Sequence, residues 1–181
     1  TKQTAEGKIR EMLQEAFSGA RVFQGGGNEI LGTDLQDMTL EAATNALQRL
    51  YPQFHVADHA GWPKVYEKAQ KGAPDALKNV GDDGEPAKNT VCKAILAFIA
   101  GGKKGIDIRK NFEGATYGWP GDAVDGSLQL LLVAGLIRAQ DEKGQTIDPK
   151  DLERKVIGKT MFKVESATVS AAQRIQIRKV L

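Results

Sequence analysis

Residues 91–147 carry the feature that most limits the fold, a fixed order of three helix patterns and one hairpin pattern. Apolar residues recur every three or four positions in the first and third stretches. The second is a short helix with Ile106 and Ile108 as its apolar residues, and the last two stretches are strand-like. The five stretches are residues 91–99, 105–112, 124–132, 136–140 and 145–147. Gly144 suits the positive φ of the turn between the last two. This is the order of a winged helix-turn-helix domain, which we expect in residues 84–148.

The residues before this domain predict a helical subdomain over residues 1–83. Apolar spacing indicates a helix near residues 4–18 and another that begins at a T-x-x-Q capping box, Thr33–Gln36. A further helix begins at Trp62, and residues 21–31 form a short hairpin or an exposed glycine loop. The polar run 81–86 lacks apolar residues and predicts the boundary between the two parts.

Residues 149–181 predict a strand followed by a truncated last helix. Thr160, Phe162 and Val164 alternate as in a strand, and an S-x-x-Q capping box at residues 170–173 opens the helix. The expected fold class is therefore mainly α with small β, in three parts. A helical N-terminal part is followed by a winged helix-turn-helix domain and a C-terminal strand-helix segment.

The charge is distributed unevenly along the chain. The net charge of the 181 residues is +2, but residues 1–85 hold nine Lys and Arg against thirteen Asp and Glu, and residues 86–181 hold sixteen against ten. The single cysteine, Cys92, excludes an internal disulfide and fits a reducing compartment. We expect a cytoplasmic protein without membrane contact, because no apolar run reaches the roughly 18 residues of a membrane span. The chain begins at Thr1, and we expect it to be a piece of a longer protein.

No motif in the sequence carries a complete catalytic arrangement. The glycine runs 25–27 and 101–105 lack the G-x-x-x-x-G-K-[ST] pattern of a phosphate-binding loop. His55, Asp58 and His59 could share a metal ion, but a polar loop is the preferred interpretation. We interpret Cys92 as a buried, unreactive thiol. We therefore expect no enzyme activity, no bound metal and no cofactor in these residues.

The third helix of the expected domain is poorly suited to reading DNA. We expect its first turns to be exposed, and they offer no Lys or Arg but only Gly121, Asp122, Asp125, Gly126 and Gln129. This argues against ordinary DNA reading, because phosphate contacts supply most of DNA affinity. The two carboxylates also complement the dipole of a helix N-terminus. The basic residues lie elsewhere, and they are candidates for contact with a DNA backbone or a partner: Lys103, Lys104, Arg109, Lys110, Arg138 and Lys143. They fit a solvated face or a surface for an acidic partner equally well.

An aromatic motif, Tyr117-Gly118-Trp119-Pro120, precedes the third helix. We interpret Trp119 as a core residue and Pro120 as a helix start. A stacking platform for a nucleic-acid base is the alternative.

Several spaced elements resemble the large P-loop ATPase protein of bacteriophage-exclusion (BREX) defence systems of bacteria. They are Tyr51–Phe54 with Ala57-Asp58 and Trp62, Val91-Cys92 with Ile95, Tyr117–Pro120 with Asp122–Asp125 and Ala134-Gly135, and Met161–Glu165 with Gln173. The resemblance implies an interior segment of a much larger protein that works in phage defence with other BREX proteins and DNA. That family's ATPase activity belongs to a module with Walker motifs. These residues lack such motifs, so no ATP-binding residue is carried over.

These observations lead to one main hypothesis and two alternatives. The main hypothesis is a non-catalytic, winged-helix-containing segment of a BREX-type ATPase that serves assembly or protein docking, with non-specific DNA contact. Its partners would be other domains of the parent ATPase, other BREX proteins and the DNA backbone. The first alternative is a true DNA-binding winged-helix module, and the second is a metal-dependent enzyme that uses His55, Asp58 and His59.

Overall fold

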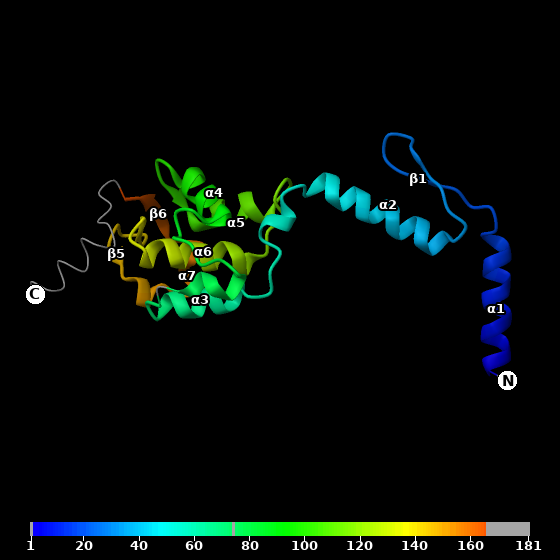
Figure 1. Cartoon of the computed structure of the whole chain (residues 1–181), viewed down its shortest axis with the longest axis horizontal. Helices are drawn as coiled ribbons and strands as arrows, with labels where there is room; N and C mark the ends of the chain where they lie inside the picture. Colours follow the sequence, from blue (N-terminus) through cyan, green and yellow to red (C-terminus); the bar gives the residue numbers. More distant parts are fainter. Residues whose placement is uncertain (1, 74, 166–181) are drawn as a thin grey trace, which may run out of the picture. The chain divides into compact units, whose positions relative to one another are not determined.

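The computed structural model describes residues 2–73 and 75–165, which are mainly helical with two small antiparallel sheets (Figure 1). The expected class, mainly α with small β, is confirmed. The chain divides into two compact units, Thr1–Pro52 (unit 1) and Gln53–Leu181 (unit 2). The helix expected after the capping box at 170–173 lies outside the described residues.

Unit 1 contains two helices and one short hairpin. Helix α1 spans Lys2–Ala16, strands β1 (Val22–Phe23) and β2 (Glu29–Ile30) pair antiparallel, and helix α2 spans Leu35–Leu50. The hairpin confirms the first of the two forms expected for residues 21–31.

The start of α2 differs from the expected capping box. Asp34, rather than Thr33, is the N-cap, and its carboxylate accepts hydrogen bonds from the amides of Gln36 at 2.8 Å and Asp37 at 3.0 Å. An aspartate is among the best N-cap residues, and its charge also complements the helix dipole. The T-x-x-Q pattern therefore identified the right turn and the wrong cap.

Unit 2 contains the remaining helices. The four longer ones are α3 (Trp62–Gln70), α4 (Thr90–Ile99), α5 (Gly105–Glu113) and α6 (Gly121–Val133). Short turns of helix connect them or follow them: η1 (Phe54–Val56), η2 (Ala76–Val80), η3 (Pro149–Asp151) and α7 (Arg154–Ile157). The order of α4, α5 and α6 agrees with the three helix patterns.

A four-stranded antiparallel sheet completes unit 2. Its strands are β3 (Lys103–Lys104), β4 (Ile137–Gln140), β5 (Thr146–Ile147) and β6 (Met161–Val164), in the spatial order β3-β6-β4-β5. The expected hairpin is β4–β5, and Gly144 in its turn has a φ of 79°. Strand β6 lies between β3 and β4. It therefore joins β3, which precedes α5, to the β4–β5 hairpin.

The core of unit 2 extends across the boundary that the polar run 81–86 predicted. Helix α6 lies between α3 and α4 (Figure 1), and α3 packs closely on it. Gly126 makes this possible, because a Cβ there would lie 3.2 Å from the carbonyl oxygen of Trp62. Trp62, Val65 and Leu77 share one buried cluster with Phe112 and Leu131. The division between compact units therefore falls after Pro52, not at residue 83.

Candidate functional site

Helix α6, the expected reading helix, has no exposed face along most of its length. Every residue from Ala123 to Leu132 is buried. The expectation that its first turns are exposed is therefore wrong: Asp125 is 5% exposed and Gln129 is fully buried. The reason is tertiary, because α3 and η3 cover the surface, and the Gln129 amide donates a hydrogen bond to the carbonyl of Pro149 at 2.6 Å.

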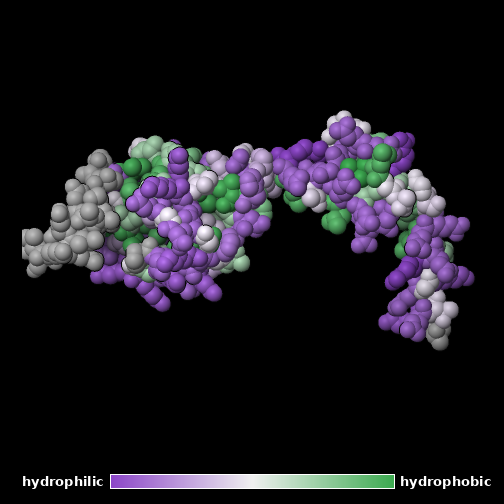
Figure 2. Space-filling view, in the orientation of Figure 1, coloured by the Kyte–Doolittle hydropathy of each residue, from purple (hydrophilic) through white to green (hydrophobic). Residues whose placement is uncertain are grey.

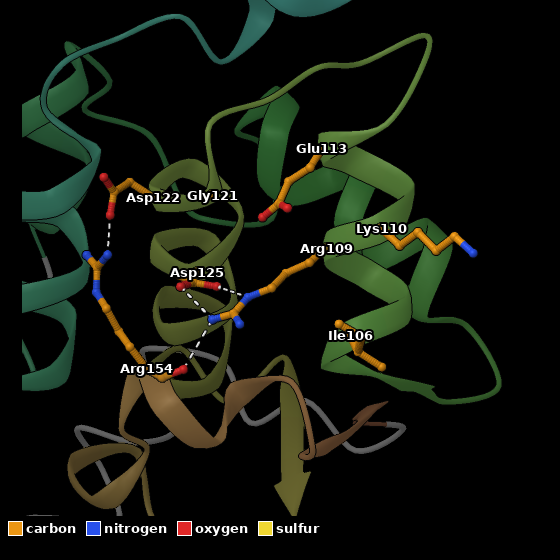
Figure 3. A pocket seen from close by; sticks show the side chains of 8 residues that line it. All are labelled: Ile106, Arg109, Lys110, Glu113, Gly121, Asp122, Asp125 and Arg154. Carbon is orange, nitrogen blue, oxygen red and sulfur yellow. Dashed lines mark hydrogen bonds and ion pairs between the residues drawn. The ribbon is translucent and has the colours of Figure 1, made fainter.

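Arg109, one of the six candidate basic residues, is bound to α6. Its guanidinium forms a fork with the Asp125 carboxylate, Nε to Oδ1 at 2.9 Å and Nη2 to Oδ2 at 2.8 Å (Figure 3). Nη2 also donates to the backbone carbonyl of Arg154 at 3.2 Å. The hydrogen bonds to Asp125 raise the pKa of Arg109 further above its ordinary value. Arg109 is therefore a structural cation that joins α5, α6 and α7, not a group free to bind phosphate.

A second arginine uses the other carboxylate of α6. Arg154 of α7 forms an ion pair with Asp122, and its guanidinium lies 4.4 Å from the centre of the Tyr66 ring on α3. The Tyr66 hydroxyl donates to the carbonyl of Leu152 at 2.7 Å, and burial raises its pKa. The acidic pair of α6 thus holds two arginines in addition to complementing the helix dipole.

These groups line an open pocket of about 740 Å³ (Figure 3). Its lining residues are Ile106, Arg109, Lys110, Glu113, Gly121, Asp122, Asp125 and Arg154. Three cations and three carboxylates line the pocket, so its lining has no net charge. Both arginines of the lining already have carboxylate partners. Glu113 forms no ion pair with any described residue. Its partial burial raises its pKa, although the nearby Arg109 opposes that shift. The pocket is therefore best explained as the place where polar contacts hold α5, α6 and α7 together.

The possible metal ligands are not gathered into a cluster. The Nδ1 atom of His59 accepts a hydrogen bond from the Gly61 amide at 2.9 Å, within the turn before α3. Among residues 2–73 and 75–165, no three His, Cys, Asp or Glu side chains form a group that could hold a metal ion.

Cys92 agrees with its interpretation as an inert thiol. The side chain is fully buried on α4, and burial raises the pKa of the thiol to about 12. A thiol of such high pKa has almost no thiolate at neutral pH.

The aromatic motif before α6 has a packing role. Trp119 is buried and stacks on Phe112, with ring centres 4.8 Å apart. Its indole N–H donates to the carbonyl of Gln53 at 2.8 Å, and the Gln53 amide donates to the carbonyl of Thr116 at 2.9 Å. Trp119 and the preceding Thr116 therefore hold both backbone groups of Gln53, the first residue of unit 2. Trp119 itself is too buried to stack on a base.

The other candidate basic residues lie on different surfaces. Lys103 and Lys104 are on β3, Lys110 is on α5, Arg138 is on β4, and Lys143 is in the β4–β5 turn. All five are exposed, and the Lys103 ammonium lies 5.3 Å from the centre of the Phe98 ring.

One side of the sheet carries two of these candidates, Lys104 and Arg138, together with Lys163, which is not among them. Lys163 on β6 lies directly opposite Arg138, and Lys104 lies opposite Met161 of the same strand. The alternation of Thr160, Phe162 and Val164 could have placed Lys163 on the outer face of a strand. It could not have placed that strand between β3 and β4.

Unit 1 exposes most of its large apolar side chains. The exposed residues of this kind are Ile9, Met12, Leu13, Phe17, Phe23, Leu31, Leu40, Leu47 and Leu50. Figure 2 shows green, apolar patches within the polar surface of this unit. Ile30 and Met38 are its buried hydrophobic residues in the described part of the chain.

Comparisons with protein-family models, curated proteins and solved structures gave no match for this chain. Within the described part of the chain, none of the helices combines the length and the apolar character that crossing a bilayer requires.

Proposed function

We propose that this chain is a non-catalytic assembly segment whose unit 1 docks on an apolar protein surface of a BREX-type phage-defence ATPase complex. The observation that carries the proposal is the uncovered apolar surface of unit 1. Leu40 and Leu47 on α2 are 65% and 57% exposed, and Met12 on α1 is 61% exposed. Burial of each such side chain stabilises a complex by roughly 1.5–3 kcal/mol.

The arrangement of these residues fits a helical docking face. Ile9, Met12 and Leu13 follow helical spacing on α1, and Leu40 and Leu47 are two turns apart on α2. Side chains at these spacings lie on one face of a helix. A partner that covers both stripes would complete a core that unit 1 lacks by itself.

Unit 2 is proposed to be a winged-helix relative that acts as a scaffold. The order α4, β3, α5, α6 and the hairpin β4–β5 supports this assignment. Two features distinguish it from a DNA reader: α3 covers α6, and β6 pairs between β3 and β4. With α6 covered and acidic, base reading in the major groove is the weaker of the two functions.

The wider setting follows from the sequence resemblance and is part of the proposal. The parent protein would be the BREX ATPase, the partners would be its other domains and other BREX proteins, and the compartment would be the cytoplasm. DNA contact, in this proposal, is made to the phosphate backbone only.

The test is a binding titration of the full 181-residue chain against purified BREX ATPase and the other proteins of the same system. The double variant Leu40→Glu, Leu47→Glu introduces two charges on the α2 stripe. We expect its Kd for the partner to rise at least about tenfold, since two buried leucines contribute roughly 1.5–3 kcal/mol each.

A matched control adds the same charges beside the stripe. Thr39→Glu with Ala46→Glu keeps the spacing and rotates both substitutions by about 100° around the helix, at positions that are also exposed. The Kd of this control should stay within about twofold of the parent value. Equal losses in both variants, or no binding to any BREX protein, would contradict the proposal. Self-association of the chain that the Leu variant alone abolishes would instead identify a second copy as the occupant.

A further inference from the structure

The outer face of the four-stranded sheet carries a like-charge pair that costs stability. Arg138 on β4 lies directly opposite Lys163 on β6. Like charges directly opposite each other on neighbouring strands are destabilising. Within the described part of the chain, neither side chain forms an ion pair or a hydrogen bond with an acidic group. Internal pairing therefore does not explain why two cations face each other here.

A third cation shares this face. Residues that pair across antiparallel strands lie on the same side of the sheet, as do residues two apart on one strand. Lys104 pairs with Met161, which lies two residues before Lys163. The opposite side of the sheet is the core side, where Ala139 and Phe162 pair and are fully buried.

The shape of the backbone supports the outward position of Lys163. Gly102 has a φ of 112°, and a Cβ at this position would lie 3.3 Å from the Lys163 Cγ. The missing side chain at Gly102 therefore leaves space for the aliphatic stem of Lys163. A lysine that packs its stem in this way keeps its ammonium in water, where it can meet a ligand.

We propose that Lys104, Arg138 and Lys163 form a basic sheet face that binds the phosphate backbone of duplex DNA without reading its sequence. The inference rests on the backbone contact in the proposed function and names the surface that makes it. Neighbouring strands are about 4.8 Å apart, so the three cations spread over roughly 10 Å across the sheet. Lys104 and Arg138 are exposed and Lys163 is half-buried. Cations spread in this way match a row of phosphates, whereas a small anion would need cations that converge.

The other residues of this face favour a duplex over a single strand. Gln140 and Met161 pair with each other on it, and Thr146 pairs with Gln140. None of these is aromatic, and single-stranded nucleic acid is usually held by bases stacked on aromatic rings. Glu165 follows β6 and is the nearest carboxylate in sequence, but it forms no ion pair with Lys163 or Arg138 among the described residues.

The remaining candidate cations are less suited to the same ligand. Arg109 is bound to Asp125, and Lys110 is on α5 beside the neutral pocket. Lys143 follows Asp141 and Glu142 in the turn, where the carboxylates would oppose a phosphate.

The experiment titrates the full chain against a labelled 30-base-pair duplex and measures fluorescence anisotropy at several salt concentrations. The triple variant Lys104→Ala, Arg138→Ala, Lys163→Ala should raise the Kd at least about tenfold. The slope of log K against log salt should fall by about 0.9 for each lost phosphate contact. Two unrelated duplex sequences should bind with the same Kd.

A control removes the same charge from another surface. Lys64→Ala and Lys68→Ala on α3 with Lys78→Ala in η2 are all at exposed positions, and this variant should keep the Kd within about twofold. Tryptophan fluorescence should show both variants folded, because Trp62 and Trp119 report on unit 2. Arg138→Ala alone should leave the unfolding midpoint unchanged or raise it, since it removes a like-charge pair.

Each other outcome contradicts a particular step. Equal loss in the control would mean that net charge, not this face, determines binding. Stronger competition by polyglutamate than by duplex DNA would identify an acidic protein as the partner. Binding lost on Lys110→Ala or Lys143→Ala but retained in the triple variant would keep the DNA contact and reject the surface. Absence of binding at 50 mM salt would reject the DNA contact itself. The docking of unit 1 would not be affected, because the titration of the Leu40→Glu, Leu47→Glu variant tests it separately.

Discussion

The two units of this chain are built from equally regular helical patterns but differ in what covers them. In unit 2, the apolar faces of α3, α4, α5 and α6 meet in one buried cluster. In unit 1, the stripes of α1 and α2 remain exposed, and α1 has no buried residue. The difference shows that apolar periodicity predicts a helix and its apolar face. It does not predict whether other residues of the same chain cover that face.

Local interactions take the place of a core in unit 1. Asp34 caps α2, Arg21 forms a fork with Glu29 beside the hairpin, and Arg49 donates to Gln24 at 3.0 Å. Exposed contacts of this kind contribute little to stability, because solvent screens them. Helices of 15 or 16 residues without tertiary support are marginal in water. Unit 1 is therefore the part of the molecule with the least internal support.

The largest expected difference between the units comes from leucine truncation. Leu131→Ala removes a fully buried side chain from α6 and should lower the free energy of unfolding of unit 2 by about 2–5 kcal/mol. Leu47→Ala on α2 should lower the free energy of unfolding of unit 1 by less than about 0.5 kcal/mol, because Leu47 is exposed. Urea unfolding followed by tryptophan fluorescence measures the loss in unit 2, where both tryptophans lie, and amide hydrogen exchange in α2 measures the loss in unit 1. Similar losses would show that the α2 stripe is covered in solution.

A smaller difference is expected between the ion pairs. Asp125→Asn leaves the partly buried Arg109 without its counter-charge and should cost unit 2 about 2–4 kcal/mol. Glu29→Gln removes the partner of the exposed Arg21 and should cost the hairpin of unit 1 much less, because solvent screens this pair. Urea unfolding measures the first, and amide hydrogen exchange of Val22 and Ile30 measures the second. A cost for Asp125→Asn as small as that for Glu29→Gln would reject the structural role assigned to Arg109.

The smallest expected effect is a pH dependence in unit 2. Burial raises the pKa of Glu113, so its protonated form favours the folded state. That contribution is fully present below the unfolded pKa, near 4.5, and is lost as the pH rises through the folded value. Glu113→Gln should therefore raise the urea midpoint slightly at pH 7 and leave it unchanged at pH 4. A carboxylate stabilised by Arg109 would give the opposite sign at pH 7.

Glu29 supplies the matching comparison in unit 1. Its hydrogen bonds to Arg21 lower its pKa, so its contribution to the hairpin is present at neutral pH and is lost as the pH falls through the lowered value. As the pH falls, protonation of Glu29 should therefore reduce the protection of the hairpin amides. Protonation of Glu113 should instead raise the urea midpoint of unit 2.

Much of the fold could be predicted from local sequence, and little of the candidate site could. The helices α4, α5 and α6, the hairpin β4–β5 and the buried Cys92 follow from periodicity, turn residues and hydrophobicity. The cap of α2 was misassigned by one residue, because two neighbouring residues, Thr33 and Asp34, both have capping side chains. The burial of Asp125 and Gln129 was missed because their partners, Arg109 and the carbonyl of Pro149, lie 16 and 20 residues away in the chain.

The sequence by itself determined which segments form helices and strands, since spacing, capping and turn chemistry act within a few residues. It also determined that the third helix is acidic and that the basic surplus lies elsewhere. Only the tertiary structure decided that α3 covers α6 and that Arg109 forms an ion pair with Asp125. It also decided that β6 places Lys163 between Lys104 and Arg138. These outcomes depend on packing between distant segments, where a glycine such as Gly126 permits close approach and the register of a strand decides which charges meet.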